Sequence, residues 1–209
     1  STLFPYTTLF RSGRRLEPER GRRALLKEVR PTSGRVLAAL FSILGSRGTA
    51  RGSLEGVRFL DLFAGTGRVG LEALERGADT VFVESVRARA QAIERAVPRA
   101  AQGGAAVLNL ELRRAVAWLL KRGQVFDIVF ADPPYHEGWG AALLTVKGLS
   151  ELLAPDGILV VEHASREPLT VPPEWRAGSD REYGETTLTF LHPARNIAGS
   201  APQEGGQDA

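Results

Sequence analysis

The stretch Asp61-Leu-Phe-Ala-Gly65-Thr-Gly67-Arg-Val-Gly70 decides the fold, because it joins a buried strand to a helix through a glycine-rich turn. The apolar run over 57–63 predicts the strand, and the pattern over 68–76 predicts the helix. The three glycines have the spacing G-x-G-x-x-G, in which the missing β-carbons let the backbone turn tightly and lie close to a ligand.

Strands and helices alternate along the rest of the chain. Apolar runs predict strands over 80–84, 105–110, 125–131 and 158–162, and amphipathic segments predict helices over 87–97, 113–122 and 139–153. Two last strands, 175–183 and 186–192, are expected to form a hairpin around Gly184. This alternation predicts an α/β protein with a doubly wound, mainly parallel sheet. Ligands of such sheets bind beyond the carboxyl ends of the strands.

Four segments are expected along the chain. Residues 1–12 repeat the triplet Thr-Leu-Phe and are interpreted as a non-native or disordered leader. Residues 13–56 are expected to form a basic arm, a helix that Thr32 or Ser33 caps, and a glycine-rich linker. The α/β domain that carries the motifs is expected over 57–192, followed by a disordered tail over 193–209.

Composition excludes several classes of protein. The chain has 209 residues without cysteine and with three histidines, which rules out disulfides and thiolate metal sites and leaves no metal expected. Neither an apolar run long enough to cross a bilayer nor a secretory signal is present, so a cytoplasmic protein without a membrane partner is expected.

The charge is unevenly placed. The net charge is +3, but residues 11–58 carry +8 and the remaining chain carries −5. A basic arm on a mildly acidic body favours a polyanionic partner such as nucleic acid. A solvated arginine-rich tail without a partner would have the same composition.

Two carboxylates near the glycine turn indicate the type of cofactor. Asp61, four residues before the first glycine, would balance the cationic amino-acid end of S-adenosylmethionine and would repel a pyrophosphate. Glu84, at the end of the second strand, would accept hydrogen bonds from ribose hydroxyls, although NAD enzymes use the same device. S-adenosylmethionine is therefore the favoured cofactor. Binding of NAD or FAD, and a plain turn-capping role for Asp61, stay open.

The motif Asp132-Pro133-Pro134-Tyr135 follows the fourth strand. An exocyclic base amine is a poor nucleophile, so a site that methylates it must accept hydrogen bonds from both of its hydrogens. Asp132 offers a carboxylate for one, and the carbonyl of Pro133, held in direction by the proline rings, is expected to accept the other. Tyr135 offers a flat face on which a base turned out of its stack would rest. A proline-stiffened turn is the alternative.

With these motifs the chain resembles the class I methyltransferases, and more narrowly the bacterial small-subunit (16S) ribosomal RNA guanine-N2 methyltransferases. The resemblance covers Gly13 to His192 and rests on the following segments: Arg30-Pro-Thr-Ser-Gly-Arg35-Val, Ala39-Leu-Phe-Ser-Ile-Leu44, Asp61 to Gly67, Gly70-Leu-Glu-Ala73, Arg76-Gly-Ala78, Val83-Glu84, Asp132 to Tyr135 and Tyr183-Gly-Glu185. The resemblance implies a Rossmann-like sheet of seven strands with an antiparallel C-terminal hairpin.

The resemblance also implies a substrate and its contacts. The substrate would be a guanine of 16S ribosomal RNA, presented on a partly assembled small subunit. Cofactor contacts are expected at Asp61, Phe63, Ala64, Gly65, Thr66, Gly67 and Glu84. RNA contacts are expected at Arg14, Arg15, Arg22, Arg23, Arg30, Thr32 and Arg35.

The chain departs from this family at two places. Ser1–Ser12 stands where the family has an apolar strand before its Gly-Arg-Arg unit. After the third strand, where such enzymes place a polar or acidic residue near the adenine amine, this chain has Arg113-Arg114. The usual adenine contact is therefore not expected here, and a backbone group would replace it.

Other functions share part of this pattern. An NAD(P)-dependent oxidoreductase would need the glycine turn but not Asp132 to Tyr135. DNA-adenine and protein-glutamine methyltransferases would share both motifs. The former usually carry a target-recognition region, and the latter usually have Asn in place of Asp132. A non-catalytic RNA-binding module would need only the basic arm.

Overall fold

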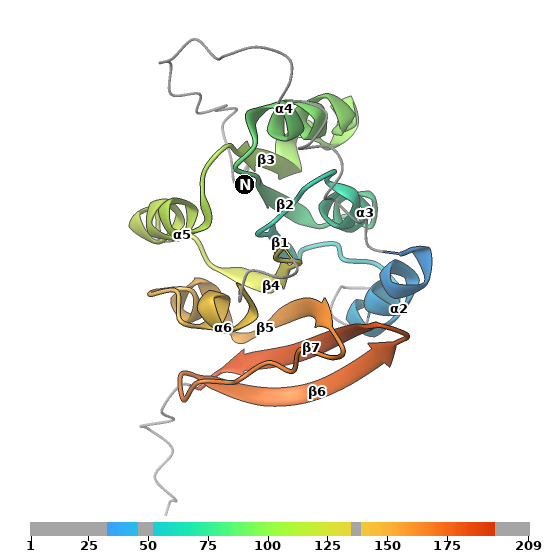
Figure 1. The fold of residues 1–209 in the computed structure, drawn as a ribbon. Coiled ribbons are helices and arrows are strands. Elements are labelled where there is room, and N and C mark those ends of the chain that lie inside the picture. The colour runs from blue at the N-terminus through green and yellow to red at the C-terminus, as the bar shows by residue number, and fades with distance from the viewer. Residues whose placement is uncertain (1–32, 46–51, 135–138, 195–209) are drawn as a thin grey trace, which may run out of the picture.

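The computed structural model describes residues 33–45, 52–134 and 139–194 (Figure 1). The expected leader, most of the basic arm, part of the linker, Tyr135 and most of the tail lie outside the described residues. The same holds for six of the expected RNA contacts: Arg14, Arg15, Arg22, Arg23, Arg30 and Thr32. Within the described ranges, no helix is both long and apolar enough to cross a membrane.

The chain folds into one sheet covered by helices. The elements are α2 (Gly34–Leu44), β1 (Arg58–Asp61), α3 (Arg68–Glu75), β2 (Asp79–Val83), α4 (Arg87–Ala96), η2 (Arg99–Gly104), β3 (Ala105–Leu108), α5 (Leu112–Lys121), β4 (Phe126–Ala131), α6 (Trp139–Leu144), η3 (Ser150–Leu152), β5 (Leu153–Ala164), β6 (Trp175–Tyr183) and β7 (Thr186–Pro193). The seven strands lie in the order β3-β2-β1-β4-β5-β7-β6.

The sheet confirms the predicted fold class. Strands β1 to β5 pair in parallel, whereas β7 lies antiparallel between β5 and β6. The two antiparallel strands form the expected C-terminal hairpin, with Gly184 at a φ of +67° in its turn. The order reverses at β1, because the chain runs outward to β2 and β3 and then returns to β4. Ligands of doubly wound sheets bind at such a switch point.

One predicted helix is wrong. A continuous helix was expected over 139–153, but α6 ends at Leu144 and only the short 3₁₀ turn η3 precedes β5. Gly148 adopts a φ of +85°, which breaks the helical path. Of the apolar positions that predicted the helix, Leu149 and Leu153 are buried, whereas Val146 is half-buried and Ala142 is exposed, so the pattern identified only part of the core and not the backbone between its positions.

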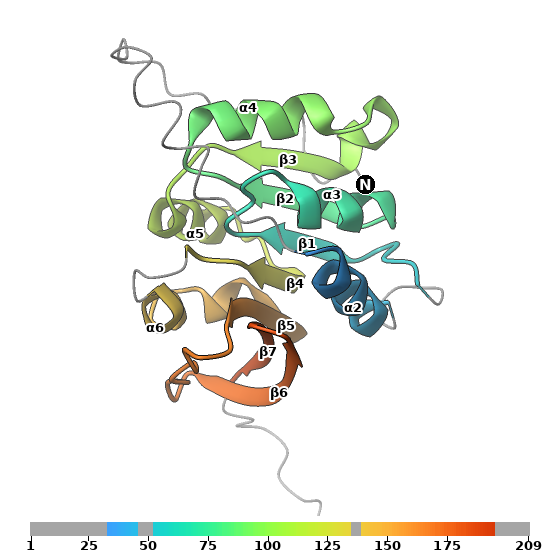
Figure 2. The same ribbon diagram turned by 45° about the vertical axis from the view of Figure 1, so that its right-hand side comes forward.

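Side chains alternate between the two faces of the sheet and form separate cores. On one face, α5 and the segment from α6 to η3 pack against residues such as Leu60, Val129 and Leu159. On the other face, α2 and α3 pack against residues such as Phe59 and Phe130, and α3 and α4 cover Phe82 farther along the sheet. Figures 1 and 2 show these helix layers on opposite sides of the strands.

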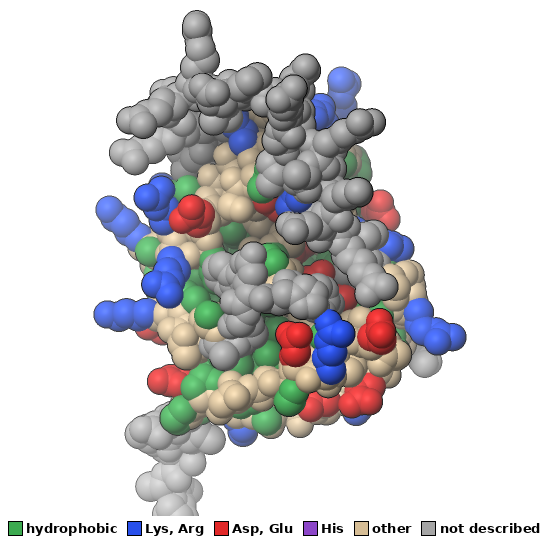
Figure 3. All heavy atoms as spheres, in the orientation of Figure 1, with side chains coloured by type: hydrophobic (Ala, Val, Ile, Leu, Met, Phe, Trp, Pro, Cys, Tyr) green, Lys and Arg blue, Asp and Glu red, His purple; other side chains and the backbone are tan. Residues whose placement is uncertain are grey.

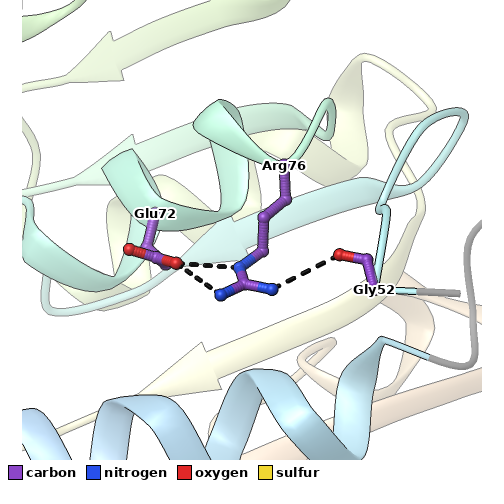
Figure 4. A network of polar contacts seen from close by, with 3 residues as sticks. All are labelled: Gly52, Glu72 and Arg76. Carbon is purple, nitrogen blue, oxygen red and sulfur yellow. Dashed lines mark hydrogen bonds and ion pairs between the residues drawn. The ribbon is translucent and has the colours of Figure 1, made fainter.

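Arg76 ties α2 and the segment before β1 to the end of α3. Its guanidinium donates two hydrogen bonds to Glu72 Oε1, at 2.8 and 2.6 Å, and one to the carbonyl of Gly52 at 3.3 Å (Figure 4). The same group lies 4.8 Å from the centre of the Phe41 ring in α2. These contacts hold the C-terminal half of α2 beside the end of α3 and the segment before β1, at the amino edge of the sheet and away from the glycine loop.

Gly70→Ala is expected to destabilise the protein by about 1–3 kcal/mol, because an added methyl would overlap the ring of Phe82. A β-carbon at this position would lie 2.8 Å from Phe82 Cδ1 and closer still to Cε1, and the ring is fully buried. Urea unfolding would measure the loss. Gly103→Ala is the matched control, because nothing lies within 4 Å of its added carbon. Equal stability of the two variants would contradict the packing role of Gly70.

Candidate active site

Four acidic residues end neighbouring strands at the carboxyl edge of the sheet. Asp61 closes β1, Glu84 follows β2, Asp132 follows β4 and Glu162 lies near the end of β5. Because side chains alternate along a strand, Asp61 shares a face with Phe59, Asp132 with Phe130 and Glu162 with Val160. In the same way Glu84 shares a face with Phe82, so all four carboxylates point to the side covered by α2, α3 and α4.

The glycine loop crosses this edge between β1 and α3. Gly65 and Gly67 have φ values of +55° and +81°, a backbone conformation that residues with a β-carbon rarely adopt. The loop is held by hydrogen bonds from Ala64 N to Val83 O at 3.0 Å and from Gly67 N to Ala64 O at 2.6 Å. Phe63 is half-buried and Thr66 is exposed. The loop therefore has the tight turn that its sequence predicts.

Asp61 is fully buried beneath this loop. Its Oδ2 accepts a hydrogen bond from Gly70 N at 3.1 Å, but its buried Oδ1 has no hydrogen-bond partner among the described residues. The pKa of Asp61 is raised to about 7, mainly by burial and in smaller part by the charge of Glu84, while the backbone N–H groups of Gly70 and Phe63 oppose this rise. A cation arriving at Oδ1 would therefore find a carboxylate without a counter-charge.

Glu84 is held in one orientation by the backbone. Its Oε2 accepts from Gly65 N at 2.9 Å and its Oε1 accepts from Val86 N at 2.7 Å. Each carboxylate oxygen has a second acceptor position, so two more donors could be bound. Asn109 donates to the carbonyls of Glu84 and Ser85 at 2.8 and 2.9 Å and so links the ends of β2 and β3.

Asp132 lies where β4 ends, with Pro133 buried and Pro134 exposed after it. Its Oδ1 is buried and has no hydrogen-bond partner among the described residues. Burial raises the pKa of Asp132 well above its usual value, and the charges of Glu162 and Asp61 raise it further. The structure thus brings Asp132 close to Asp61, the carboxylate that lies beneath the glycine loop. Tyr135 lies outside the described residues.

Glu162 and Asn109 belong to this edge but were missed by the sequence reasoning. Glu162 is 3% exposed, and its position beside Asp132 follows from the pairing of Ala131 with Val161 in the preceding register. An acidic residue at the end of an otherwise apolar strand was the available signal. Asn109 was not identified because the third strand was expected to continue to residue 110.

The structure also places the arginine pair Arg113-Arg114 and the expected RNA contact Arg35. Strand β3 ends at Leu108, so the first polar residues after it are Asn109 and Glu111, and Arg113-Arg114 lie exposed in the first turn of α5. The departure inferred at the adenine position is therefore not supported, because an acidic residue, Glu111, follows the third strand whether that strand ends at 108 or at 110. Arg35 is exposed in the first turn of α2, which Ser33 caps because its Oγ accepts a 3.3 Å hydrogen bond from Val36 N.

The arrangement suits chemistry that needs acceptors and negative charge. Among the described residues, no group of three or more histidine or carboxylate side chains could hold a metal ion. A buried edge with two carboxylate oxygens that have no partner within the described ranges would stabilise a cationic ligand and would accept hydrogen bonds from an amine.

Solved structures share this architecture. A hypothetical protein of Thermus thermophilus superposes with a TM-score of 0.67 at 32% identity, over 79% of this chain and 90% of that chain. The 16S rRNA N2 methyltransferase RsmC of T. thermophilus, solved with AdoMet and guanosine, shares the fold with a TM-score of 0.56 at 23% identity, over 80% and 44% of the two chains. The fold is therefore that of the class I methyltransferases.

Sequence relatives place the chain within that class. Residues 13–192 match the family described as Conserved hypothetical protein 95. The Ribosomal RNA small subunit methyltransferase D of Escherichia coli K12 is 31% identical over 159 residues, which is 75% of this chain and 76% of that protein. The protein is therefore a member of this family, which includes ribosomal RNA small subunit methyltransferase D.

Proposed function

We propose that the protein transfers a methyl group from S-adenosylmethionine to the exocyclic N2 amine of a guanine in 16S ribosomal RNA. The observation that carries the proposal is the pair of buried oxygens of Asp61 and Asp132, which lie on one face of the sheet edge and have no hydrogen-bond partner in the described part of the chain. The family relationship supports ribosomal RNA as the substrate, because the E. coli relative is named for the small ribosomal subunit.

The residues of the first two strand ends fit the cofactor. When bound, S-adenosylmethionine supplies an electrophilic methyl group on a cationic sulfur. Asp61 would accept hydrogen bonds from the cationic amino group through Oδ1, which lacks a partner among the described residues. Glu84 would accept from the ribose hydroxyls with the acceptor positions left by Gly65 and Val86. The loop from Phe63 to Gly67 would lie against the cofactor, since its glycines leave room for close approach.

The ends of β4 and β5 fit a guanine edge. Asp132 would accept one hydrogen of the amine, and the carbonyl of Pro133 would accept the other, so that the nitrogen lone pair points at the methyl group. Guanine carries a second donor, N1–H, next to its N2 amine, whereas adenine carries an acceptor at the position next to its amine. The side of the site that contains Asp132 and Glu162 is rich in hydrogen-bond acceptors. It therefore favours guanine, whose edge presents two neighbouring donors. Pro134 would stiffen the turn, and Tyr135 would stack on the base.

The basic N-terminal segment would hold the RNA. Arg35 is exposed at the start of α2, on the face to which the carboxylates point. Its neighbours in the sequence, Arg30 and Thr32, would border the base. Arg14, Arg15, Arg22 and Arg23 would contact phosphates, which explains the excess of positive charge before residue 58. The partner would be a partly assembled small subunit, in which the target base is still accessible.

The direct test is to map the methylated atom. The protein would be incubated with labelled S-adenosylmethionine and with either naked 16S ribosomal RNA or small subunits from a strain that lacks its own enzyme. The expected product is N2-methylguanine at one nucleotide, formed with Asp132 intact and not with Asp132→Ala. Label in adenine, in DNA or in a protein glutamine would contradict the proposal. Thermal stabilisation by NAD but not by S-adenosylhomocysteine would instead indicate an oxidoreductase.

A further inference from the structure

The exposed face of α5 carries only positive charge. Arg114, Trp118 and Arg122 lie four residues apart and therefore form one stripe along the helix, and Arg113 and Lys121 form a second stripe beside it. All four cations are exposed, while Leu112, Ala115, Val116 and Leu119 bury the opposite side in the core. In Figure 3, Lys and Arg side chains project along the left of the molecule, where α5 lies in Figure 1.

These charges are not neutralised within the described part of the protein. Helices α3 and α4 mix arginine with glutamate, but residues 112–122 contain no acidic residue. No carboxylate of the described residues forms an ion pair with any of the four cations. Glu111, the nearest acidic residue in the sequence, is exposed just before the helix. The face therefore repels cations and remains available to an anionic partner.

The first turn of α5 contradicts a local rule of helix electrostatics. The N-terminus of a helix has a partial positive charge, so arginine is unfavourable there and acidic residues are preferred. In α5 the first turn contains Arg113 and Arg114 and no acidic residue. Helices α3 and α4 also begin with arginine and without an acidic residue in the first turn, so this feature does not by itself distinguish α5.

Trp118 holds one of the cations in place. The guanidinium carbon of Arg122 lies 3.5 Å from the centre of the Trp118 ring, and the ring is partly buried against the core. A stacked guanidinium keeps its hydrogen-bond donors directed outward and loses less conformational freedom when it binds phosphate. Because Arg122 covers the ring, Trp118 serves as a support for the cation and not as a platform for a base.

We infer that this face of α5, defined by Arg113, Arg114, Lys121 and Arg122, binds the phosphate backbone of the substrate RNA. The inference rests on the proposed function for the identity of the nucleic acid. Helix α5 starts from the carboxyl edge of the sheet, on the opposite face from the four carboxylates. RNA bound along it would leave the active edge on the face opposite to α2 and its exposed Arg35, so cations on both faces of the sheet would hold the strands that flank the target base.

The test compares the salt dependence of RNA binding in charge variants of the full chain. Binding of a 16S ribosomal RNA transcript would be measured over a series of KCl concentrations. Arg114→Gln/Arg122→Gln is expected to reduce the slope of log K against log salt by about 1.5, because each lost phosphate contact removes roughly 0.7–0.9. Arg114→Lys/Arg122→Lys should keep most of the slope, since it keeps both charges.

The matched control is Arg176→Gln/Arg181→Gln. It removes two exposed arginines from β6, the edge strand farthest from β3 in the sheet, and should leave the slope unchanged. An unchanged slope in the α5 glutamine variant, an equal loss in the β6 control, or an equal loss in the lysine variant would each overturn the inference. Methyl transfer by the wild-type chain is measured separately, on the naked RNA and on small subunits from a strain that lacks its own enzyme, so a protein that is inactive on both but whose RNA binding still depends on α5 would overturn only the proposed function.

Discussion

Asp132→Ala is expected to lower kcat for methyl transfer by about 1000-fold or more, while the affinity for S-adenosylhomocysteine changes by less than about threefold. The reason is that the carboxylate acts on the amine that is methylated, whereas Asp61 and Glu84 would hold the cofactor. Single-turnover transfer of labelled methyl groups and calorimetric titration would measure the two effects separately.

Asp132→Asn separates the shape of the side chain from its charge. The amide keeps one carbonyl acceptor but places a donor where the carboxylate had a second acceptor, so a loss of about 100-fold is expected. Asp127→Asn is the control, because Asp127 accepts a backbone hydrogen bond from Arg58 at the amino end of β4, away from the active edge. Equal loss of turnover and of cofactor affinity would indicate a structural role, and unchanged turnover would favour a non-catalytic RNA-binding module.

Asp61→Asn is expected to weaken the binding of S-adenosylhomocysteine by about 10- to 100-fold, the range expected when a charge-assisted hydrogen bond is lost. In the wild-type protein the pKa of Asp61 is raised to about 7. The cationic amino group needs the ionised carboxylate, so affinity should rise about tenfold per pH unit up to roughly pH 7 and then level off. The asparagine variant should lack this dependence.

The same substitution is expected to stabilise the free protein. A carboxyl group whose pKa is higher in the folded state than in the unfolded state adds stability at low pH, and that contribution is lost as the pH rises from about 4 to about 7. Asparagine carries no charge to bury, so at about pH 8 the variant should be more stable by about 2–4 kcal/mol. Urea unfolding of the free protein as a function of pH would measure this.

The two effects of Asp61→Asn have opposite signs, which makes the prediction specific. A residue that only supported the turn would lose stability on substitution and would leave the pH dependence of cofactor binding intact. Asp127→Asn again serves as the control, because it removes a carboxylate from the other end of the sheet. A variant that is both less stable and unchanged in affinity would show that Asp61 is a turn residue.

Most of the fold was predictable because local patterns and sheet geometry agree. All strands except β5 lie within two residues of their predicted ends, since apolar runs bounded by turn residues report burial directly. The prediction failed where one hydrophobic pattern is compatible with more than one backbone conformation. The leucines between α6 and β5 fit a helix, a 3₁₀ turn and a strand end equally well, and only the left-handed conformation of Gly148 separates them.

The candidate site was likewise predictable from the sequence only in part. Asp61, Glu84 and Asp132 lie at the ends of predicted strands, and ligands of parallel sheets bind beyond the carboxyl ends of the strands. Glu162 could not be found from its own neighbours, because its significance comes from the register of β5 against β4. The basic face of α5 was visible in the sequence only as a pair of arginines at an unexpected position.

The amino-acid sequence by itself determined the alternation of strands and helices, the glycine turn and the chemical groups at each strand end, because these depend on residues close together in the chain. Tertiary structure alone decided which carboxylates share one face and which of their oxygens lack a partner among the described residues. It also decided that four cations of α5 lie exposed without an ion pair in the described part of the chain. Burial and pairing depend on strand order and register, which join residues distant in sequence, so no local pattern could report them.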